Sequence, residues 1–199
     1  MILTNEIDSK VGVTHTYKEI RVKPNRWIEM ACREAKNSVK VGGGPFGAVL
    51  LQIDDETDRV IRLWMDHNHV IEYLDPTAHA EVSVIRAACQ ELGVIDLGRI
   101  KQSESRLHQD GETSHCEIYS SCEPCPMCYS TIAWARIPAL FFSASRFDAS
   151  REGVGFQDEE LHAEVMKDYP DRKIRVHQAL SSCSLDAFDV WKAGKFARY

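Results

Sequence analysis

The stretch "SCEPCPMC", residues 121–128, places three cysteines at intervals of three, at Cys122, Cys125 and Cys128. This spacing suits an iron–sulfur cluster, a reactive thiol pair, or a metal ion held by two of the thiolates. Each of these sites would fix the fold around it. The ligands that complete the site therefore constrain this chain more than any other feature.

Two of the three interpretations lack support elsewhere in the sequence. An iron–sulfur cluster needs a fourth cysteine, and the residues after Cys128, "YSTIAWARI", contain none. Cys116 lies upstream in a predicted strand and is a poor substitute. A thiol–disulfide pair at Cys125 and Cys128 has the required spacing, but a thioredoxin-like unit carries that pair after an early strand, and here it comes late. Both remain as alternatives.

His79, in "PTAHAEV", can supply the missing ligand of a metal site. A catalytic zinc ion takes three protein ligands of the imidazole and thiolate type and keeps a fourth position for water. His79 begins a predicted helix, and Pro124 places Cys125 at the start of another. The positive ends of both helices would then face the same anionic ligands. We expect one Zn²⁺ ion per chain, held by His79, Cys125 and Cys128.

Glu81 follows His79 by two residues and is placed to contact the water rather than the metal. Zinc lowers the pKa of a water that it binds to about 7. A nearby glutamate can accept the proton and return it to a leaving amine. The pattern H-x-E followed by P-C-x-x-C is the signature of zinc nucleobase deaminases. A structural zinc site, or an inert core histidine, is the alternative.

The order of predicted elements indicates an α/β fold in which helices flank a sheet that has a hairpin at one edge. Residues 1–23 show no clear periodicity and are expected to form an N-terminal arm, while residues 24–199 form the catalytic domain. Residues 94–114 are expected to be a surface connection with some helix. Helices are predicted at 24–41, 77–93, 123–137, 157–169 and 185–196, and strands at 45–53, 60–66, 116–121, 139–144 and 173–180.

Three strings carry a family resemblance: "GGPFGAVL", "DPTAHAEVSVIRAAC" and "SCEPCPMCYSTIAWAR". They resemble the cytidine-deaminase-like superfamily, which implies a three-layer fold with a central mixed sheet between helices. Within it they are most similar to bacterial guanine deaminases, which implies zinc-dependent hydrolysis of guanine to xanthine and ammonia. The alternatives are deamination of guanosine, of a triazine such as ammeline or of adenosine in tRNA, and a zinc scaffold without activity.

The same resemblance implies the residues that hold the purine. Phe46 matches a stacking phenylalanine, and Asn68 matches a base-binding asparagine, whose amide donates and accepts at once. The backbone N–H of Ala80 is expected to help hold the substrate. Trp134 matches an aromatic residue at the pocket, with an ordinary core tryptophan as the alternative.

The C-terminal part is also expected to reach the site. "GVGFQDEEL" resembles a stretch whose acidic residue, Asp158 here, contacts the purine and can accept from ring N–H groups. Tyr199 matches an aromatic C-terminus that enters the active site. The resemblance also implies a homodimer with exchanged C-terminal segments, so that either residue could serve the partner's site. A solvated acid and a frayed terminus are the alternatives.

Composition restricts the partners. The formal net charge of −6 argues against a polyanionic partner such as nucleic acid, which Lys and Arg would have to neutralise. No apolar run reaches the roughly 20 residues of a membrane span. The N-terminus "MILTNEIDSKVGV" does not read as a secretory signal. These features predict a cytoplasmic protein, and they are compatible with the small purine base that the resemblance implies as substrate.

Overall fold

The computed structural model describes residues 12–21 and 23–196. The chain divides into two compact units, one ending at His162 and the other beginning at Ala163. The first unit contains the sheet and the residues that carry the chemistry. The predicted division into an arm, residues 1–23, and a single domain, residues 24–199, stays a prediction.

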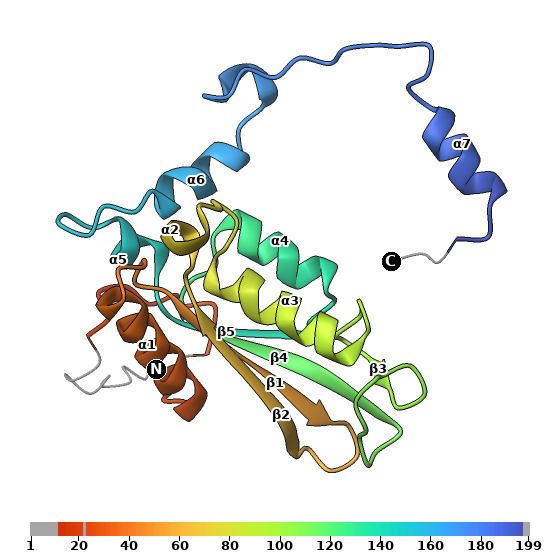
Figure 1. Cartoon of the computed structure of the whole chain (residues 1–199). Helices are drawn as coiled ribbons and strands as arrows, with labels where there is room; N and C mark the ends of the chain where they lie inside the picture. Colours follow the sequence, from red (N-terminus) through yellow and green to blue (C-terminus); the bar gives the residue numbers. More distant parts are fainter. Residues whose placement is uncertain (1–11, 22, 197–199) are drawn as a thin grey trace. The chain divides into compact units, whose positions relative to one another are not determined.

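A five-stranded mixed sheet forms the centre of the first unit (Figure 1). β4 pairs antiparallel with β1, which pairs antiparallel with β2. The other edge of β4 is shared by β3, which is antiparallel to it, and by β5, which is parallel. The strands are β1 Gly47–Asp54, β2 Val60–His67, β3 Ile100–Lys101, β4 Thr113–Cys122 and β5 Ala139–Ala144.

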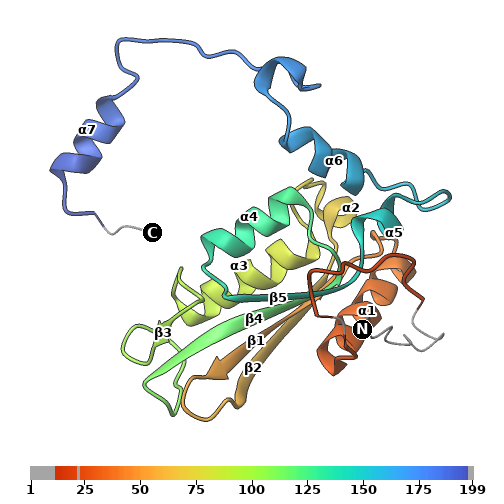
Figure 2. The same cartoon turned by 180° about the vertical axis from the view of Figure 1, so that it is seen from behind.

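Helices cover both faces of this sheet. α1 (Arg26–Lys40) lies on one face, and α3 (Ala80–Leu92) with α4 (Pro126–Trp134) lies on the other (Figures 1 and 2). Alternate residues of β1 explain this, because successive side chains of a strand point to opposite faces. Val49 and Leu51 pack with α1, whereas Leu50 packs with α3. The predicted three-layer α/β fold is confirmed.

α1 approaches the sheet closely at one point. Asn25 caps the helix by accepting from the backbone N–H groups of Trp27 and Ile28. A side chain at Gly47 would collide with the main chain of α1 at Ala31 and Ala35. The glycine therefore allows β1 to begin directly beneath this helix.

The remaining helices are short. They are α2 Val70–Tyr73, α5 Arg146–Ser150, α6 Asp158–Val165, the 3₁₀ helix Tyr169–Asp171 and α7 Asp186–Ala193. The strand predicted at 173–180 is absent from this fully described stretch, which has no regular secondary structure. None of the helices in the described residues has the length and apolar character needed to cross a membrane.

The segment 94–114 differs from its prediction as a surface connection with some helix. All of it is described, and it contains β3 and the start of β4 but no helix. Leu97 and Ile100 are fully buried in the core beneath α3. Two of its polar residues, Gln109 and Ser114, are buried as well, because they bond to one another.

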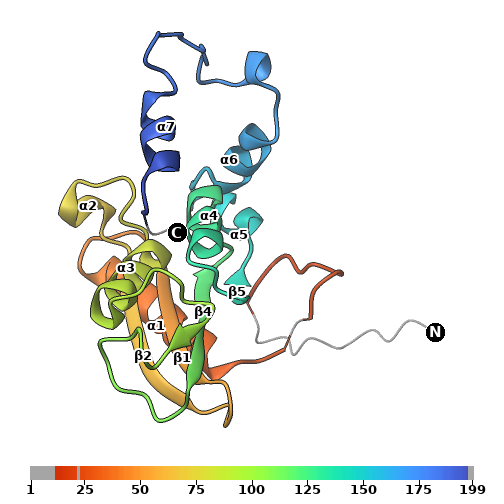
Figure 3. The ribbon, with the colours of Figure 1, turned by 90° about the vertical axis from the view of Figure 1, so that its right-hand side faces the viewer.

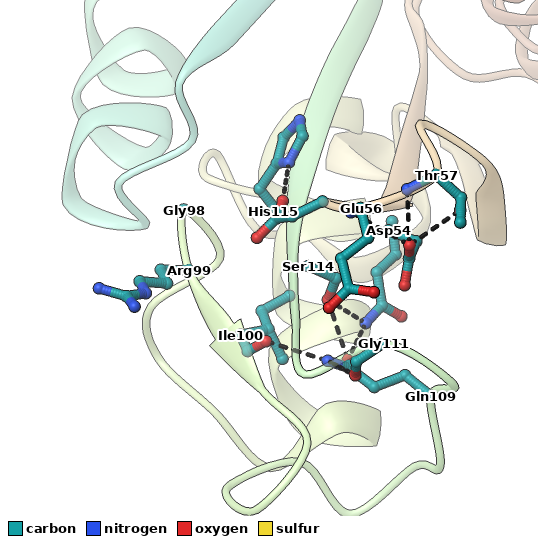
Figure 4. Close-up of polar contacts among 12 residues, drawn as sticks. Asp54, Glu56, Thr57, Gly98, Arg99, Ile100, Gln109, Gly111, Ser114 and His115 are labelled. Atoms are coloured by element: carbon teal, nitrogen blue, oxygen red, sulfur yellow. Dashed lines mark hydrogen bonds and ion pairs between the residues drawn. The ribbon is translucent and has the colours of Figure 1, made fainter.

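Gln109 is the centre of that buried polar network (Figure 4). Its Oε1 accepts from Gln52 Nε2 and from Ser114 Oγ, both at 2.9 Å. Its Nε2 donates to the carbonyl groups of Ile100 and Gly111. Gln52 Nε2 also donates to Ser114 Oγ at 2.8 Å, and Arg62 donates to Gln52 Oε1 at 2.7 Å. The network ties the segment 94–114 to the end of β1.

The described part of the N-terminal arm, residues 12–21, runs beside β5 before the chain turns to α1 (Figure 3). Thr14 donates to Asp148 of α5 through both its backbone N–H and its hydroxyl. The hydroxyl of Tyr17 donates to Glu123 at 2.7 Å, and Arg146 also binds Glu123. The arm therefore contacts the loop that leads from β4 to Cys125.

Candidate active site

Two helices of the first unit begin at the predicted metal ligands. His79 is the N-cap of α3 and Cys125 is the N-cap of α4, and both have extended backbone angles. Neither side chain accepts a hydrogen bond from its own helix. Both side chains are therefore directed elsewhere. Cys128 is one helical turn further along α4, on the same face as Cys125.

Local sequence fixes both helix starts. Asp75 accepts from the backbone N–H and the hydroxyl of Thr77, both at 2.7 Å, and so forms a tight turn that ends at His79. Pro126 is the first residue of α4, where its missing N–H leaves no bond unmade.

The donor atoms of His79, Cys125 and Cys128 lie within 4.8 Å of one another. His79 Nδ1 is 3.6 Å from Cys125 Sγ and 3.4 Å from Cys128 Sγ. A tetrahedral zinc ion with usual bond lengths separates nitrogen and sulfur ligands by about 3.6 Å. One imidazole and two thiols at these distances fit zinc with an open fourth position.

The charges of this site favour a thiolate. The hydrogen bond from Cys128 and then that from His79 lower the pKa of Cys125 to about 4, against the effect of burial. The pKa of Cys128 is raised, first by its hydrogen bond to Cys125 and then by burial. The pKa of His79 is raised by its hydrogen bond to Cys125. These directions favour a thiolate at Cys125, paired with the imidazole of His79.

Glu81 is buried beside these ligands, with only 5% of its surface exposed. Its Oε1 accepts from Ser120 Oγ at 2.9 Å, and its Oε2 accepts from Cys128 Sγ at 3.3 Å. Burial raises the pKa of the carboxyl group, although the bonds from Ser120 and Cys128 oppose the shift. A carboxyl group with a raised pKa is suited to accept and release a proton near neutrality.

Phe46 and Asn68 lie together at the start of β1. The backbone N–H of Asn68 donates to the Phe46 carbonyl at 3.0 Å, and Gly44 passes directly over the Asn68 amide. Phe156 packs edge-on against Phe46, with ring centroids 4.8 Å apart. Phe156 was not predicted as a site residue, although it lies in the "GVGFQDEEL" stretch that suggested Asp158.

Asp158 is the first residue of α6 and is half-buried. Burial raises the pKa of its carboxyl group, the charge of Cys125 raises it further, and the charge of His79 opposes the shift. His162 lies one turn later and also acts on this carboxyl group. Its Nε2 is buried without a partner in the described part of the chain, and no signal in the sequence singled it out.

The other predicted residues are distributed differently. Ala80 is fully buried in the first turn of α3, next to His79. Trp134 is 69% exposed at the end of α4, nearly two turns beyond Cys128. The structure therefore does not bring Trp134 to the ligand cluster in this chain. Tyr199 lies outside the described residues.

Cys122 takes no part in the ligand cluster. It is buried at the end of β4, and its thiol donates to the Ser145 carbonyl at 3.6 Å. Of the three cysteines in "SCEPCPMC", two therefore meet His79 while the first points to α5. This geometry opposes an iron–sulfur cluster and favours the His-Cys-Cys metal site.

Comparison with known proteins agrees with this geometry. Guanine deaminase of Bacillus subtilis is 35% identical over 167 residues, which cover 84% of this chain and 90% of the relative. The crystal structure of guanine deaminase from Bacillus subtilis superposes with a TM-score of 0.69 and 32% identity, covering 89% of this chain and 99% of that one. A tRNA-specific adenosine deaminase of Aquifex aeolicus is 33% identical over 64% of this chain and 69% of its own length.

The sequence model of the cytidine and deoxycytidylate deaminase zinc-binding region matches residues 22–144. That range spans more than half of the chain and contains His79, Glu81, Cys125 and Cys128. The chain therefore belongs to the cytidine and deoxycytidylate deaminase zinc-binding family.

Proposed function

We propose that this protein is a zinc-dependent guanine deaminase, which hydrolyses guanine to xanthine and ammonia. The observation that carries the proposal is the position of Glu81. Its carboxylate is held by Ser120 and Cys128, directly beside a donor set that fits zinc.

His79, Cys125 and Cys128 would hold the ion. When bound there, zinc supplies Lewis acidity, which makes water a nucleophile at neutral pH. The remaining chemistry belongs to Glu81. It accepts a proton from the water that attacks C2 of guanine and delivers a proton to the 2-amino nitrogen, which leaves as ammonia.

The base is held by residues on three sides in this proposal. Asn68 binds the purine edge through its amide, and Phe46 stacks on the ring system with Phe156 at its edge. Asp158 accepts from ring N–H groups, and the N–H of Ala80 donates to the substrate. Trp134 and Tyr199 remain as predicted contributors.

The extent of the relatedness favours guanine over adenosine in tRNA. The match to guanine deaminase of Bacillus subtilis spans 84% of this chain, against 64% for the tRNA-specific adenosine deaminase of Aquifex aeolicus. The net charge of −6 also opposes binding of a polyanion.

Ammonia release from zinc-loaded protein tests the proposal, with guanine, guanosine, adenine, cytosine and ammeline offered in parallel. We expect turnover of guanine alone. Turnover of guanosine instead would show that the pocket admits a ribose and would contradict the assigned substrate. Zinc bound at full occupancy without turnover of any of the five would favour an RNA substrate or the scaffold alternative.

We also propose a homodimer in the cytoplasm, with exchanged C-terminal segments as the resemblance implies. The α4 surface supports association, because Tyr129 and Trp134 are 60% and 69% exposed there. Light scattering after gel filtration should give twice the mass of one chain. Tyr129→Lys should shift the protein towards the monomer, and an unchanged monomeric mass for the wild type would contradict the proposal.

A further inference from the structure

His69 follows Asn68 directly and lies between two carboxylates. Its Nδ1 is 2.6 Å from Glu72 Oε2, and its Nε2 is 2.6 Å from Asp66 Oδ1. A neutral imidazole carries one N–H and can donate only one of these bonds. Two carboxylate contacts of this length require an imidazolium that donates from both nitrogens.

The ring of His69 is enclosed on its other sides. The residue is only 8% exposed, and the ring of Tyr73 stacks on it at 4.6 Å and 5°. The ring of His67 lies 4.4 Å away. The backbone N–H of His69 donates to the Ala78 carbonyl at 2.9 Å. This bond joins the loop of Asn68 to the turn that ends at His79.

The charges around the ring favour its protonated form. Burial alone lowers the pKa of His69, but the hydrogen bonds with Glu72 and Asp66 outweigh burial and raise the pKa above its ordinary value. The titratable groups around the ring come from three elements. Asp66 and His67 belong to β2, and Glu72 and Tyr73 belong to α2. Glu34 of α1 contacts His67.

We propose that His69, as an imidazolium held between Asp66 and Glu72, is a positioning residue that fixes the loop carrying Asn68. The effect on substrate binding rests on the proposed function, in which Asn68 contacts the base. The fixing of the loop does not depend on that assignment.

A metal ion is the competing occupant of this cluster. Donor atoms of Asp66, His67 and His69 also lie within 4.8 Å of one another. However, carboxylates occupy both nitrogens of His69 at hydrogen-bond distance. An ion-pair cluster accounts for that geometry without a cation.

The protonation state can be measured directly on zinc-loaded protein with ¹⁵N-labelled histidine. We expect NMR to show that His69 loses its second ring proton only above the ordinary histidine pKa of about 6.5, with exposed His108, 3.3 Å from Asp110, recorded in the same spectra as a reference. Loss of that proton from His69 at or below this pH would overturn the proposal. So would a second zinc equivalent that binds the wild type but not a His69→Gln variant.

The positioning role is tested with His69→Gln and, as its matched control, His108→Gln. Backbone hydrogen exchange in residues 68–74 should become faster in the first variant only. If guanine is the substrate, its KM should rise roughly tenfold, with a much smaller change in kcat, because charge-assisted bonds to the loop are lost. Unchanged exchange in His69→Gln would overturn the positioning role.

The pH dependence follows from the raised pKa. The charged ring is present below the ordinary histidine pKa of about 6.5 and is lost as pH rises through the higher pKa of the folded protein. The KM of the wild type should therefore increase at alkaline pH. The KM of His69→Gln should already be high at neutral pH and should not show this increase. Absence of guanine turnover would count against the proposed function alone, since NMR and hydrogen exchange still decide the role of His69.

Discussion

The two ends of β4 bury polar side chains in opposite ways. Ser114, near its start, joins Gln52 and Gln109 in a network whose donors and acceptors have fixed partners. Ser120, near its end, donates to a buried carboxylate that lies among two thiols and an imidazole. At the first end, the buried polar groups have their hydrogen-bond partners within the protein. The second gathers thiol, imidazole and carboxyl groups that can bind a cation and a proton, and this difference separates a structural end of the sheet from a reactive one.

Loss of a metal ligand should produce the largest difference between the two ends. Cys128→Ala should reduce bound zinc from about one ion per chain to almost none and abolish turnover, because two protein ligands hold zinc poorly. Elemental analysis of the purified protein measures the metal. Gln52→Leu, at the other end, should retain zinc, and loss of zinc from both variants would remove the distinction.

Glu81→Gln should reduce turnover by about 100- to 10,000-fold, because the amide cannot carry a proton between water and the amine. Zinc content should remain that of the wild type. Thermal stability should be retained or increased, since burial disfavours the charged carboxylate that the variant removes. Substantial remaining turnover would contradict the role of Glu81.

Gln109→Ala should lower the free energy of unfolding by about 2–4 kcal/mol, because it leaves a cavity and several buried groups without partners. The kcat/KM of the folded variant should match that of the wild type. Glu104→Ala is a suitable control, since it removes the exposed ion pair with Lys101 in the same segment and should cost less than about 1 kcal/mol. Equal losses would show that the network is not a stabilising unit.

The two serines of β4 give the finest test, because they lie on the same face of one strand and both are buried. Ser114→Ala should cost about 1–3 kcal/mol of stability with unchanged turnover. Ser120→Ala should lower turnover about tenfold through a misplaced Glu81, at a smaller cost in stability. Denaturant unfolding and steady-state rates measured on both variants decide whether the effects separate in this way.

The sequence predicted the residues around the Ser120 end of β4 better than those around the Ser114 end. The sequence singled out His79, Glu81, Cys125 and Cys128 because zinc deaminase chemistry imposes residue types at fixed spacing, and the structure places these four side chains together. The layers of the fold were found because helix and strand periodicities are local. The surroundings of His69 combine residues from three elements. Phe156 contacts Phe46, although the two residues are far apart in the sequence. Such contacts exist only after folding and leave no periodic signal.

The prediction for the segment 94–114 was wrong only in part. Most of its polar residues are at least partly exposed, as in a surface connection, but Gln109 and Ser114 are buried because they satisfy one another. Polarity predicts exposure only where a residue has no internal partner. The strand predicted at 173–180 was wrong because alternation alone does not supply a neighbouring strand to pair with.

The contact between the N-terminal arm and Glu123 matters for anyone who shortens this chain. A protein beginning at residue 24 would keep each motif residue and the whole sheet. It would nevertheless lose the hydroxyl of Tyr17 that binds Glu123, two positions before a metal ligand. Trimming to the recognisable domain would thus leave Glu123 with Arg146 but without Tyr17, and the loop that leads to Cys125 would be held less firmly.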